Sequence, residues 1–341
     1  MKAYVAYGNG RCGFEELPIP SYGDYEVLVK LESCGVCNGT DLKIIHGTFK
    51  GVEDYPAVLG HEGVGRVVEL GAKVRSFQKG DLILMPYIGQ TPAGMYSAWG
   101  TYAEYNVAAD AAAMEADGLL PEPFAYGQQR LPGDLDPVSA SVIITFREVL
   151  STMKLFGFES GKSLAVLGQG TVGLSFIRFA KLLGMGPVIA LGRKEDKLRQ
   201  AREMGADATV NILETDPVSA VRALCPEGVD YALDAAGVPA FLNQALGMIK
   251  PDARICVYGI SGQMQAEVDW SRCPYNWTLQ FNQFPSKRLE AEALPQILAW
   301  MRLGVLDPAA FVSQVYPFAQ IGEAFQRVER GDTNLKFVIK F

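Results

Sequence analysis

Two cysteines, Cys34 and Cys37, form a Cys-x-x-Cys pair, and a histidine and a glutamate follow at His61 and Glu62. Such a pair alone serves either redox chemistry or zinc binding, but no second pair follows it, so the sequence excludes a four-cysteine zinc site. One thiolate, one imidazole and one carboxylate would instead hold a tetrahedral zinc ion whose fourth position stays open for water or a substrate oxygen. This donor set predicts a catalytic rather than a structural metal site.

A glycine-rich segment, residues 168–173, carries the second set of residues that indicate chemistry. It reads Gly-Gln-Gly-Thr-Val-Gly, follows an apolar run at 163–167 and precedes a helical pattern at 172–183. In this context the first glycine permits a tight turn, the second lets a pyrophosphate approach the backbone, and the third lets helix and strand pack closely. The free N–H groups at the start of the helix then bind the phosphates. The segment therefore predicts dinucleotide binding by Gly168, Gly170, Thr171, Val172 and Gly173.

The end of the next expected strand, residues 188–191, indicates which dinucleotide is bound. An NAD site usually has an acidic residue there, which accepts hydrogen bonds from the ribose hydroxyls. This chain has Gly192 instead, followed by Arg193 and Lys194. The missing acid removes the repulsion against a 2′-phosphate, and the guanidinium can bind that phosphate through two charge-assisted hydrogen bonds. The sequence predicts NADP preference; the alternative is that the two basic residues only open a solvated helix.

The sequence shows two different patterns of secondary structure, and the elements that they predict must position these residues. Up to about residue 145, short apolar or β-branched runs such as 26–31 and 82–85 are punctuated by Gly and Pro, which is typical of a small barrel or sandwich. Beyond that point strands alternate with helices, which predicts a parallel sheet covered on both faces. A further helix is expected over 291–302. The β-like tail, 337–341, has nothing to pair with alone and is expected to return to the first domain.

The segment Gly60-His61-Glu62, followed by Gly65, Gly71 and Val74, resembles the signature of the zinc-containing alcohol dehydrogenases. Further matching stretches occur in the order of that family: 34–41, 80–81, 100–105 and 168–173. The resemblance covers essentially the whole chain, and the sorbitol and threonine dehydrogenase branches, which have a Glu after the His, are the most similar. The chain is thus identified as a member of the zinc-dependent medium-chain alcohol dehydrogenase family.

This resemblance implies an α/β fold with a GroES-like, β-rich catalytic domain and a Rossmann domain whose doubly wound parallel sheet binds NADP(H), with the active site between them. The expected boundaries are 1–145 for the catalytic domain, 146–284 for the Rossmann domain and 285–341 for a C-terminal segment that returns to the catalytic domain. By the same resemblance Cys37, His61 and Glu62 hold one catalytic zinc ion. The glutamate either coordinates the ion directly or lies just behind it, and Cys34 is expected to be a small buried residue.

The chain departs from the family pattern in its further metal ligands. Many relatives carry four closely spaced cysteines for a structural zinc, but no cysteine lies between Gly80 and Leu131, so a second zinc of that kind is not expected. The family often has another ligand ahead of the Rossmann domain, and Ile144, which cannot ligate, occupies that position. Asp136 and Glu148 do not fall in register. A three-residue site completed by water is the simpler interpretation.

The loop after Cys37 bears on proton transfer. It is one residue longer than the usual Cys-Gly-Thr-Asp, and Lys43 stands where many relatives have a relay histidine. We expect the zinc ion to lower the pKa of an alcohol, whose carbon then gives hydride to nicotinamide C4. Thr40 is expected to accept the hydroxyl proton and to relay it through the ribose, with Lys43 either a further relay or a solvated surface residue. In reverse, zinc polarises a carbonyl and NADPH reduces it.

Length and composition exclude several classes of protein. The 341 residues favour two domains, and a net charge of −7 gives no electrostatic case for nucleic acid. No apolar run is long enough to span a membrane, the N-terminus has no secretory pattern, and six cysteines fit a reducing cytoplasm better than a disulfide framework. The expected partners are a small-molecule alcohol or carbonyl substrate and further copies of the chain, as a homodimer or homotetramer like the relatives.

Two other functions stay open. A zinc-free NADPH-dependent quinone or carbonyl reductase of the same fold would lack the cysteine and the Gly-His-Glu segment that this chain keeps, and metal analysis distinguishes it. A non-catalytic NADPH-binding protein would show no turnover. The substrate itself is not readable: the loops expected to line the pocket, 87–99 and 270–284, are rich in aromatic and polar groups that suit a polyol, a cyclitol or a modest aromatic alcohol.

Overall fold

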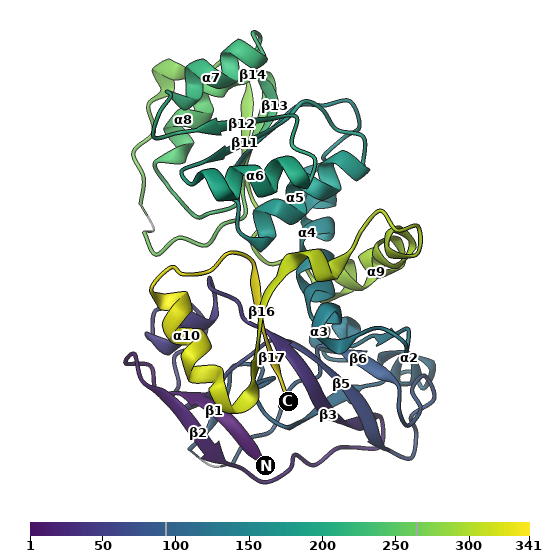
Figure 1. The fold of residues 1–341 in the computed structure, drawn as a ribbon. Helices are drawn as coiled ribbons and strands as arrows, with labels where there is room; N and C mark the ends of the chain where they lie inside the picture. Colours follow the sequence, from purple (N-terminus) through teal and green to yellow (C-terminus); the bar gives the residue numbers. More distant parts are fainter. Residues whose placement is uncertain (93, 264) are drawn as a thin grey trace. The chain divides into compact units, whose positions relative to one another are not determined.

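The structure, a computed structural model, describes residues 1–92, 94–263 and 265–341. Its contacts divide the chain into two compact units (Figure 1): Met1–Arg147 with Ser286–Phe341, and Glu148–Pro285. Helix α4 (Val142–Phe156) continues from the first unit into the second. No helix within the described ranges is long and apolar enough to cross a membrane.

The first unit is built on a seven-stranded sheet. Its strands follow the order β16-β17-β3-β5-β6-β9, and β8 also pairs with β3. Their bounds are Glu26–Gly35 for β3, Glu62–Leu70 for β5, Leu82–Leu84 for β6, Tyr105–Ala109 for β8, Arg130–Leu131 for β9, Val312–Pro317 for β16 and Lys336–Lys340 for β17. The antiparallel pairing of β3 with β5 sets Gly35 opposite Glu62. This register matters for the site because both strand ends carry its residues.

A smaller sheet and short helices complete the first unit. The sheet has the order β2-β1-β4-β7. Its strands are β1 (Lys2–Ala6), β2 (Cys12–Glu16), β4 (Ala57–Val58) and β7 (Tyr96–Ser97). The helices are α1 (Asp41–Ile45), α2 (Ala111–Ala116), η1 (Pro123–Gly127), α3 (Pro137–Ala140), α9 (Lys287–Arg302), η3 (Pro308–Phe311), η4 (Phe318–Gln320) and α10 (Ile321–Glu329). Residues of both chain segments, among them Tyr102 and Phe325, pack in one apolar core, so the C-terminal segment is an integral part of this unit.

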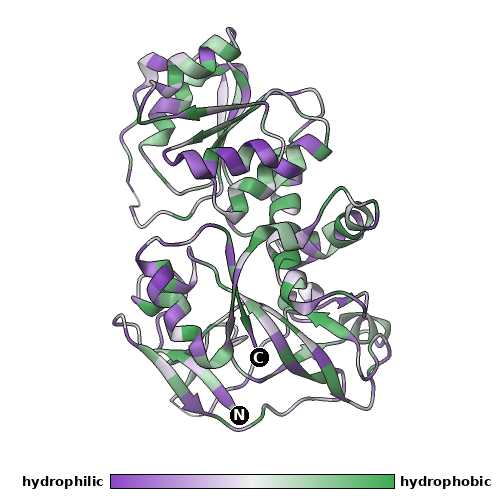
Figure 2. Ribbon diagram, in the orientation of Figure 1, coloured by the Kyte–Doolittle hydropathy of each residue, from purple (hydrophilic) through white to green (hydrophobic). Residues whose placement is uncertain are grey.

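The second unit contains a six-stranded parallel sheet in the order β12-β11-β10-β13-β14-β15. The strands are β10 (Leu164–Leu167), β11 (Val188–Gly192), β12 (Ala208–Asn211), β13 (Val229–Asp234), β14 (Ile249–Val257) and β15 (Trp277–Phe281). The helices are α5 (Thr171–Leu182), α6 (Glu195–Glu203), α7 (Pro217–Leu224), α8 (Phe241–Met248) and η2 (Trp270–Arg272). Every residue of β10 and β11 is buried, as expected for strands covered on both faces, whereas α6 exposes a hydrophilic face (Figure 2). The predicted Rossmann-type α/β fold is therefore confirmed.

Two segments, the tail and residues 270–284, can be compared with the elements expected there. The tail forms β17, which pairs with β3 and β16 and so lies in the first unit. The expectation of a loop over 270–284 is wrong in part, because residues 277–281 form the edge strand β15. Its sequence, Trp-Thr-Leu-Gln-Phe, alternates apolar and polar side chains with the two-residue period of a strand. That alternation was the signal that could have predicted it.

Candidate functional site

The pairing of β3 with β5 brings together residues from two separate parts of the sequence. Cys37 follows the end of β3, and His61 immediately precedes β5, whose first residue is Glu62. Gly60, in the turn before them, has a φ of +100°, which a side chain would strain, and a Cβ there would lie 2.7 Å from the backbone of Tyr102. The local backbone thus requires the glycine that precedes the histidine.

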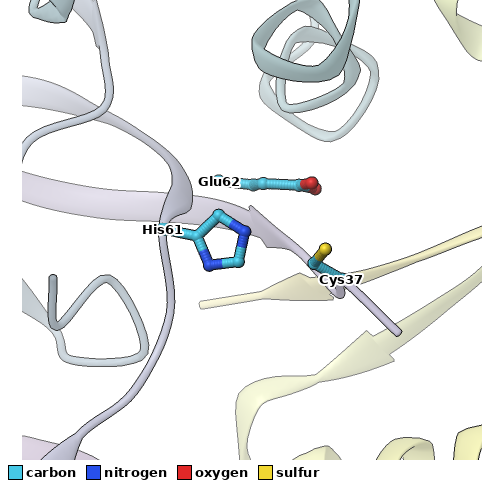
Figure 3. Close-up of side chains that lie close together, drawn as sticks. All are labelled: Cys37, His61 and Glu62. Carbon is cyan, nitrogen blue, oxygen red and sulfur yellow. The ribbon is translucent and has the colours of Figure 1, made fainter. Parts of the chain in front are cut away.

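The three expected metal ligands form one group. Cys37, His61 and Glu62 each offer a ligand atom, and these atoms lie within 4.8 Å of one another. Their side chains point toward a common space (Figure 3). Cys37 and His61 are partly exposed, whereas Glu62 is buried. A thiolate, an imidazole and a carboxylate at this spacing suit a zinc ion, because zinc takes sulfur, nitrogen and oxygen ligands in tetrahedral sites.

A lysine that sequence reasoning missed neutralises the buried glutamate. Lys336 Nζ donates hydrogen bonds of 2.7 Å to both carboxylate oxygens of Glu62, and Thr145 Oγ1 lies 3.3 Å from Oε1. Burial opposes the charge of Lys336, but the Glu62 carboxylate outweighs it and raises the pKa of the lysine. A Cβ at Gly35 would overlap Glu62 Oε2, so this glycine makes room for the carboxylate. The available signal was a lysine directly before three apolar residues of the terminal strand.

An aspartate lies behind the histidine. Asp41 Oδ1 is 3.4 Å from His61 Nδ1, which leaves Nε2 as the other ring nitrogen for an ion. Asp41 Oδ2 accepts hydrogen bonds from the Tyr102 hydroxyl, at 2.7 Å, and from the backbone N–H of Cys37, at 3.0 Å. Burial opposes a charged ring, but the Asp41 carboxylate and the Cys37 sulfur outweigh it and hold the pKa of His61 well above its usual value. A carboxylate in this place orients a metal-binding imidazole.

The remaining residues singled out in this unit have separate places. Thr40 is buried at the N-terminus of α1, and Lys43 lies within α1, where burial lowers its pKa. Cys34 is fully buried with its Sγ 3.1 Å from Thr101 Oγ1, outside the ligand group. Ile144 is buried, and its neighbour Thr145 contacts Glu62 instead. Asp136 caps α3. In the loop expected over 87–99, residues 96–97 form β7 and Ala93 lies outside the described residues.

The glycine-rich turn of the second unit connects β10 to α5. Gly168 has a φ of +102°, and a Cβ at Gly173 would overlap the carbonyl oxygen of Gly168, so neither position tolerates a side chain. Gly170 is the N-cap of α5, and a Cβ there would meet no described atom within 4 Å. Thr171 and Val172 begin the helix. The turn therefore presents open space and free N–H groups at a helix N-terminus, which fits a phosphate group.

The strand end expected to select the dinucleotide lies beside this turn. Gly192 is the last residue of β11, and β11 pairs with β10. Arg193 and Lys194 follow it and are exposed, with Lys194 as the N-cap of α6. The side chain of Gln169, within the glycine-rich turn, contacts Gly192. Sequence reasoning did not single out this glutamine, because a residue between the glycines of such a turn carries no recognisable pattern.

Comparison with known proteins identifies both units. An alcohol dehydrogenase GroES-like domain matches residues 23–118, and a zinc-binding dehydrogenase domain matches residues 171–294. The sorbitol dehydrogenase of Bacillus subtilis is 27% identical over 336 residues, which are 96% of this chain and 93% of that protein. The NADP-dependent isopropanol dehydrogenase of Thermoanaerobacter brockii is 28% identical and covers 95% of each chain. The structure of the alcohol dehydrogenase TADH from Thermus sp. ATN1 superposes with a TM-score of 0.81 at 25% identity, covering 100% of this chain and 99% of that one.

Proposed function

The chain belongs to the zinc-dependent medium-chain alcohol dehydrogenase family, and from this premise we propose that it uses one zinc ion and NADP(H) to interconvert a secondary alcohol and its ketone. The single observation that carries the zinc part is the convergence of Cys37, His61 and Glu62 within 4.8 Å. We assign the catalytic domain to residues 1–145 with 285–341 and the NADP domain to 146–284.

Three side chains would hold the ion and keep it oriented. Cys37 supplies a thiolate, His61 supplies Nε2, and Glu62 supplies a carboxylate oxygen, with Lys336 balancing the charge of that carboxylate. A bound zinc ion would supply Lewis-acid chemistry, lowering the pKa of an alcohol or polarising a carbonyl. Asp41, whose Oδ1 lies 3.4 Å from His61 Nδ1, would orient the ring of His61 and leave its other nitrogen for the ion.

Two residues of helix α1 and its N-cap, after Cys37, are the candidates for proton transfer. Thr40 is buried three residues after Cys37, and its Oγ1 would accept the hydrogen bond of the substrate hydroxyl and receive its proton. Lys43 Nζ would be the further acceptor toward water. Burial lowers the pKa of Lys43, which favours proton exchange closer to neutral pH than for an ordinary lysine.

The second unit would bind NADP(H). The open backbone at Gly170 suits the pyrophosphate, and Gly168, Thr171, Val172 and Gly173 shape the turn and helix start around it. Gly192 carries no acid to repel a 2′-phosphate, and the exposed Arg193 and Lys194 offer cations to bind it. Bound NADP(H) would supply the hydride chemistry of the reaction. The NADP dependence that the name of the Thermoanaerobacter relative states supports this preference.

The substrate is proposed as a secondary alcohol, such as a polyol or cyclitol, or its carbonyl counterpart. The names of the relatives include both a sorbitol and an isopropanol dehydrogenase, so the family resemblance spans polyhydroxylated and simple secondary alcohols. A panel of such alcohols and ketones, monitored by NADPH absorbance with and without a chelator, identifies the class. Turnover that resists exhaustive zinc removal would instead favour the zinc-free carbonyl reductase.

A substitution of the thiolate ligand tests the zinc assignment. Cys37→Ala should lose bound zinc and more than about 1000-fold of turnover, because a two-ligand site binds zinc poorly and no Lewis acid remains. NADPH affinity should change by less than about threefold, since the glycine-rich turn is untouched. Cys34→Ala, in the same Cys-x-x-Cys pair but outside the ligand group, is the matched control and should keep its zinc. Full turnover in a zinc-depleted Cys37→Ala protein would refute the zinc mechanism.

Arg193→Ala tests the cofactor assignment. Loss of a charge-assisted bond to the 2′-phosphate should weaken NADP⁺ binding about tenfold or more, while NAD⁺ binding changes little. Titration of both cofactors by fluorescence measures the two dissociation constants directly. An equal loss for the two cofactors would mean that Arg193 does not read the 2′-phosphate.

We also propose that the chain assembles as a homodimer or homotetramer. The edge strand β15 and its surroundings expose large apolar side chains: Trp270 is 65% exposed and Phe281 is 62% exposed. Among the described residues β15 pairs with β14 on one side only, and an open strand edge beside such side chains favours antiparallel pairing with a second copy. Light scattering on the wild type and on Phe281→Lys measures the assembly, and a monomeric wild type would refute it.

A further inference from the structure

The side chain of Gln169 occupies a defined place in the glycine-rich turn. Gln169 stands between Gly168 and Gly170, and only 7% of it is exposed. Its Nε2 donates a hydrogen bond of 2.6 Å to the carbonyl oxygen of Leu191 and a longer one of 3.3 Å to that of Val166. The glutamine therefore bridges the C-terminal ends of strands β10 and β11. It lies beside Gly192, the strand end that is expected to contact the ribose of the cofactor.

These two hydrogen bonds orient the amide. Both partners are backbone carbonyl oxygens, which only accept hydrogen bonds, so the NH₂ group of Gln169 must face them. The carbonyl oxygen Oε1 is then directed to the other side, toward Gly192. Rotating the amide by half a turn would set two acceptors against each other.

Gly192 leaves the space that this oxygen fills. A Cβ at residue 192 would overlap Gln169 Oε1, and it would also lie 3.0 Å from Gln169 Cδ and 3.0 Å from Leu198 Cδ2. Any side chain at residue 192 must therefore displace the amide of Gln169 from the position in which it bonds to Leu191. Whether an acidic side chain fits at residue 192 thus depends on the side chain at residue 169.

We propose that Gln169 is a specificity-determining residue, whose side chain occupies the place beside Gly192 where an acidic side chain would read the ribose of NAD. In this arrangement the selectivity of the site depends on a pair, Gln169 with Gly192, and not on Gly192 alone. An acid introduced at residue 192 meets both a steric obstacle and an acceptor oxygen that repels its carboxylate. The inference deepens the proposed NADP preference and rests on it.

A double-mutant cycle tests the pair. The four proteins are wild type, Gln169→Ala, Gly192→Asp and the double variant, each measured for the dissociation constants of NADPH and NADH by fluorescence titration and for Tm without cofactor. Neither readout depends on zinc or on turnover. Gly133→Asp, an exposed glycine where a Cβ meets no described atom within 4 Å, is the matched control for placing an acid on a glycine.

The expected results follow from the overlap. Gly192→Asp alone should lower the Tm by several degrees and weaken both cofactors, without a gain in NADH affinity. Gln169→Ala alone gives the reference values that the cycle needs, and Gly133→Asp should match the wild type. The double variant should recover part of the lost Tm and bind NADH about tenfold more tightly than Gly192→Asp, because the carboxylate then has room to face the ribose hydroxyls.

Two outcomes overturn the inference. One is that Gly192→Asp alone gains NADH affinity as strongly as the double variant does, and the other is that the Tm changes of the two substitutions simply add. A wild type that binds NADH as tightly as NADPH refutes the proposed NADP preference instead. The Tm cycle of the cofactor-free proteins still decides whether Gln169 obstructs residue 192 in that case, so the two failures are distinguishable.

Discussion

The metal-ligand group of the first unit and the glycine-rich turn of the second differ in how far apart along the chain their parts lie. The turn is a run of six consecutive residues whose properties reside in the backbone, namely the φ of Gly168 and the absent Cβ of Gly173. The ligand group instead depends on side chains from two chain segments, and its buried glutamate is paired with Lys336, almost at the C-terminus.

This difference determines which substitutions should damage each site. A site made from local backbone is sensitive to any added side chain, whereas a site made from distant side chains is sensitive to the loss of one partner. Four substitutions sharpen the contrast, two in each unit, taken from the largest expected effect to the smallest.

Lys336→Met should have the largest effect on stability. It leaves the Glu62 carboxylate buried without its cation, and breaking a buried pair in this way costs about 3–5 kcal/mol of unfolding free energy. Urea unfolding of the metal-free protein measures the loss. Lys340→Met, an exposed lysine on the same strand, is the control and should cost little. If Lys336→Met has the same unfolding free energy as Lys340→Met, the buried pair of Lys336 and Glu62 does not stabilise the fold.

Gly173→Ala should be the next most damaging change. The new Cβ overlaps the carbonyl oxygen of Gly168, and forcing α5 away from β10 should cost about 2–3 kcal/mol of unfolding free energy and weaken NADPH binding.

Gly170→Ala separates the loss of stability from the loss of binding. Its Cβ meets no described atom within 4 Å, so the Tm should stay unchanged while NADPH binds at least about tenfold more weakly. Unchanged NADPH affinity in Gly170→Ala would show that the pyrophosphate does not lie over this glycine.

Asp230 makes the stability of the second unit depend on pH. Burial alone would raise its pKa, but hydrogen bonds from Lys250 and from Ser163 outweigh burial and lower the pKa of Asp230 to about 2. The unfolded value is about 4, so the charged carboxylate stabilises the fold by about 2 kcal/mol at neutral pH, and this contribution disappears as the pH falls toward 2. Asp230→Asn should therefore be less stable than wild type at pH 7, with a difference that shrinks below about pH 4. A constant difference across that range would contradict the assignment.

Asp41→Asn should have the smallest of these effects. The amide keeps the size of the side chain but removes the charge that faces His61 Nδ1, and loss of such an orienting carboxylate weakens metal binding about tenfold or somewhat more. Competition with a coloured chelator measures zinc affinity without recourse to turnover. Tyr102→Phe, which removes the hydroxyl that donates to Asp41 and to the carbonyl oxygen of Gly35 but keeps the Asp41 charge, should change zinc affinity less. Equal zinc affinity in wild type and Asp41→Asn would place the aspartate outside the metal site.

The roles of Cys37, His61 and Glu62 in zinc binding, and of Thr40 and Lys43 in proton transfer, stay predictions until such measurements are made. What the sequence already indicated was the type of each element and the kinds of donor. The glycine-rich turn was recognisable because its requirements are local: a positive φ, a close approach and a helix start all fall within six residues. The alternation of buried strands with helices predicted the parallel sheet for the same reason, since burial on both faces needs apolar runs.

The tertiary structure alone decided which residues face one another. Lys336 meets Glu62 only because β17 pairs with β3, and β3 with β5, in one particular register. Gln169 meets Gly192 only because β10 and β11 are neighbours. Sequence patterns report the environment that a residue needs, buried or exposed, flexible or constrained. The identity of its partner depends on strand order and register, which are set by the packing of the whole unit.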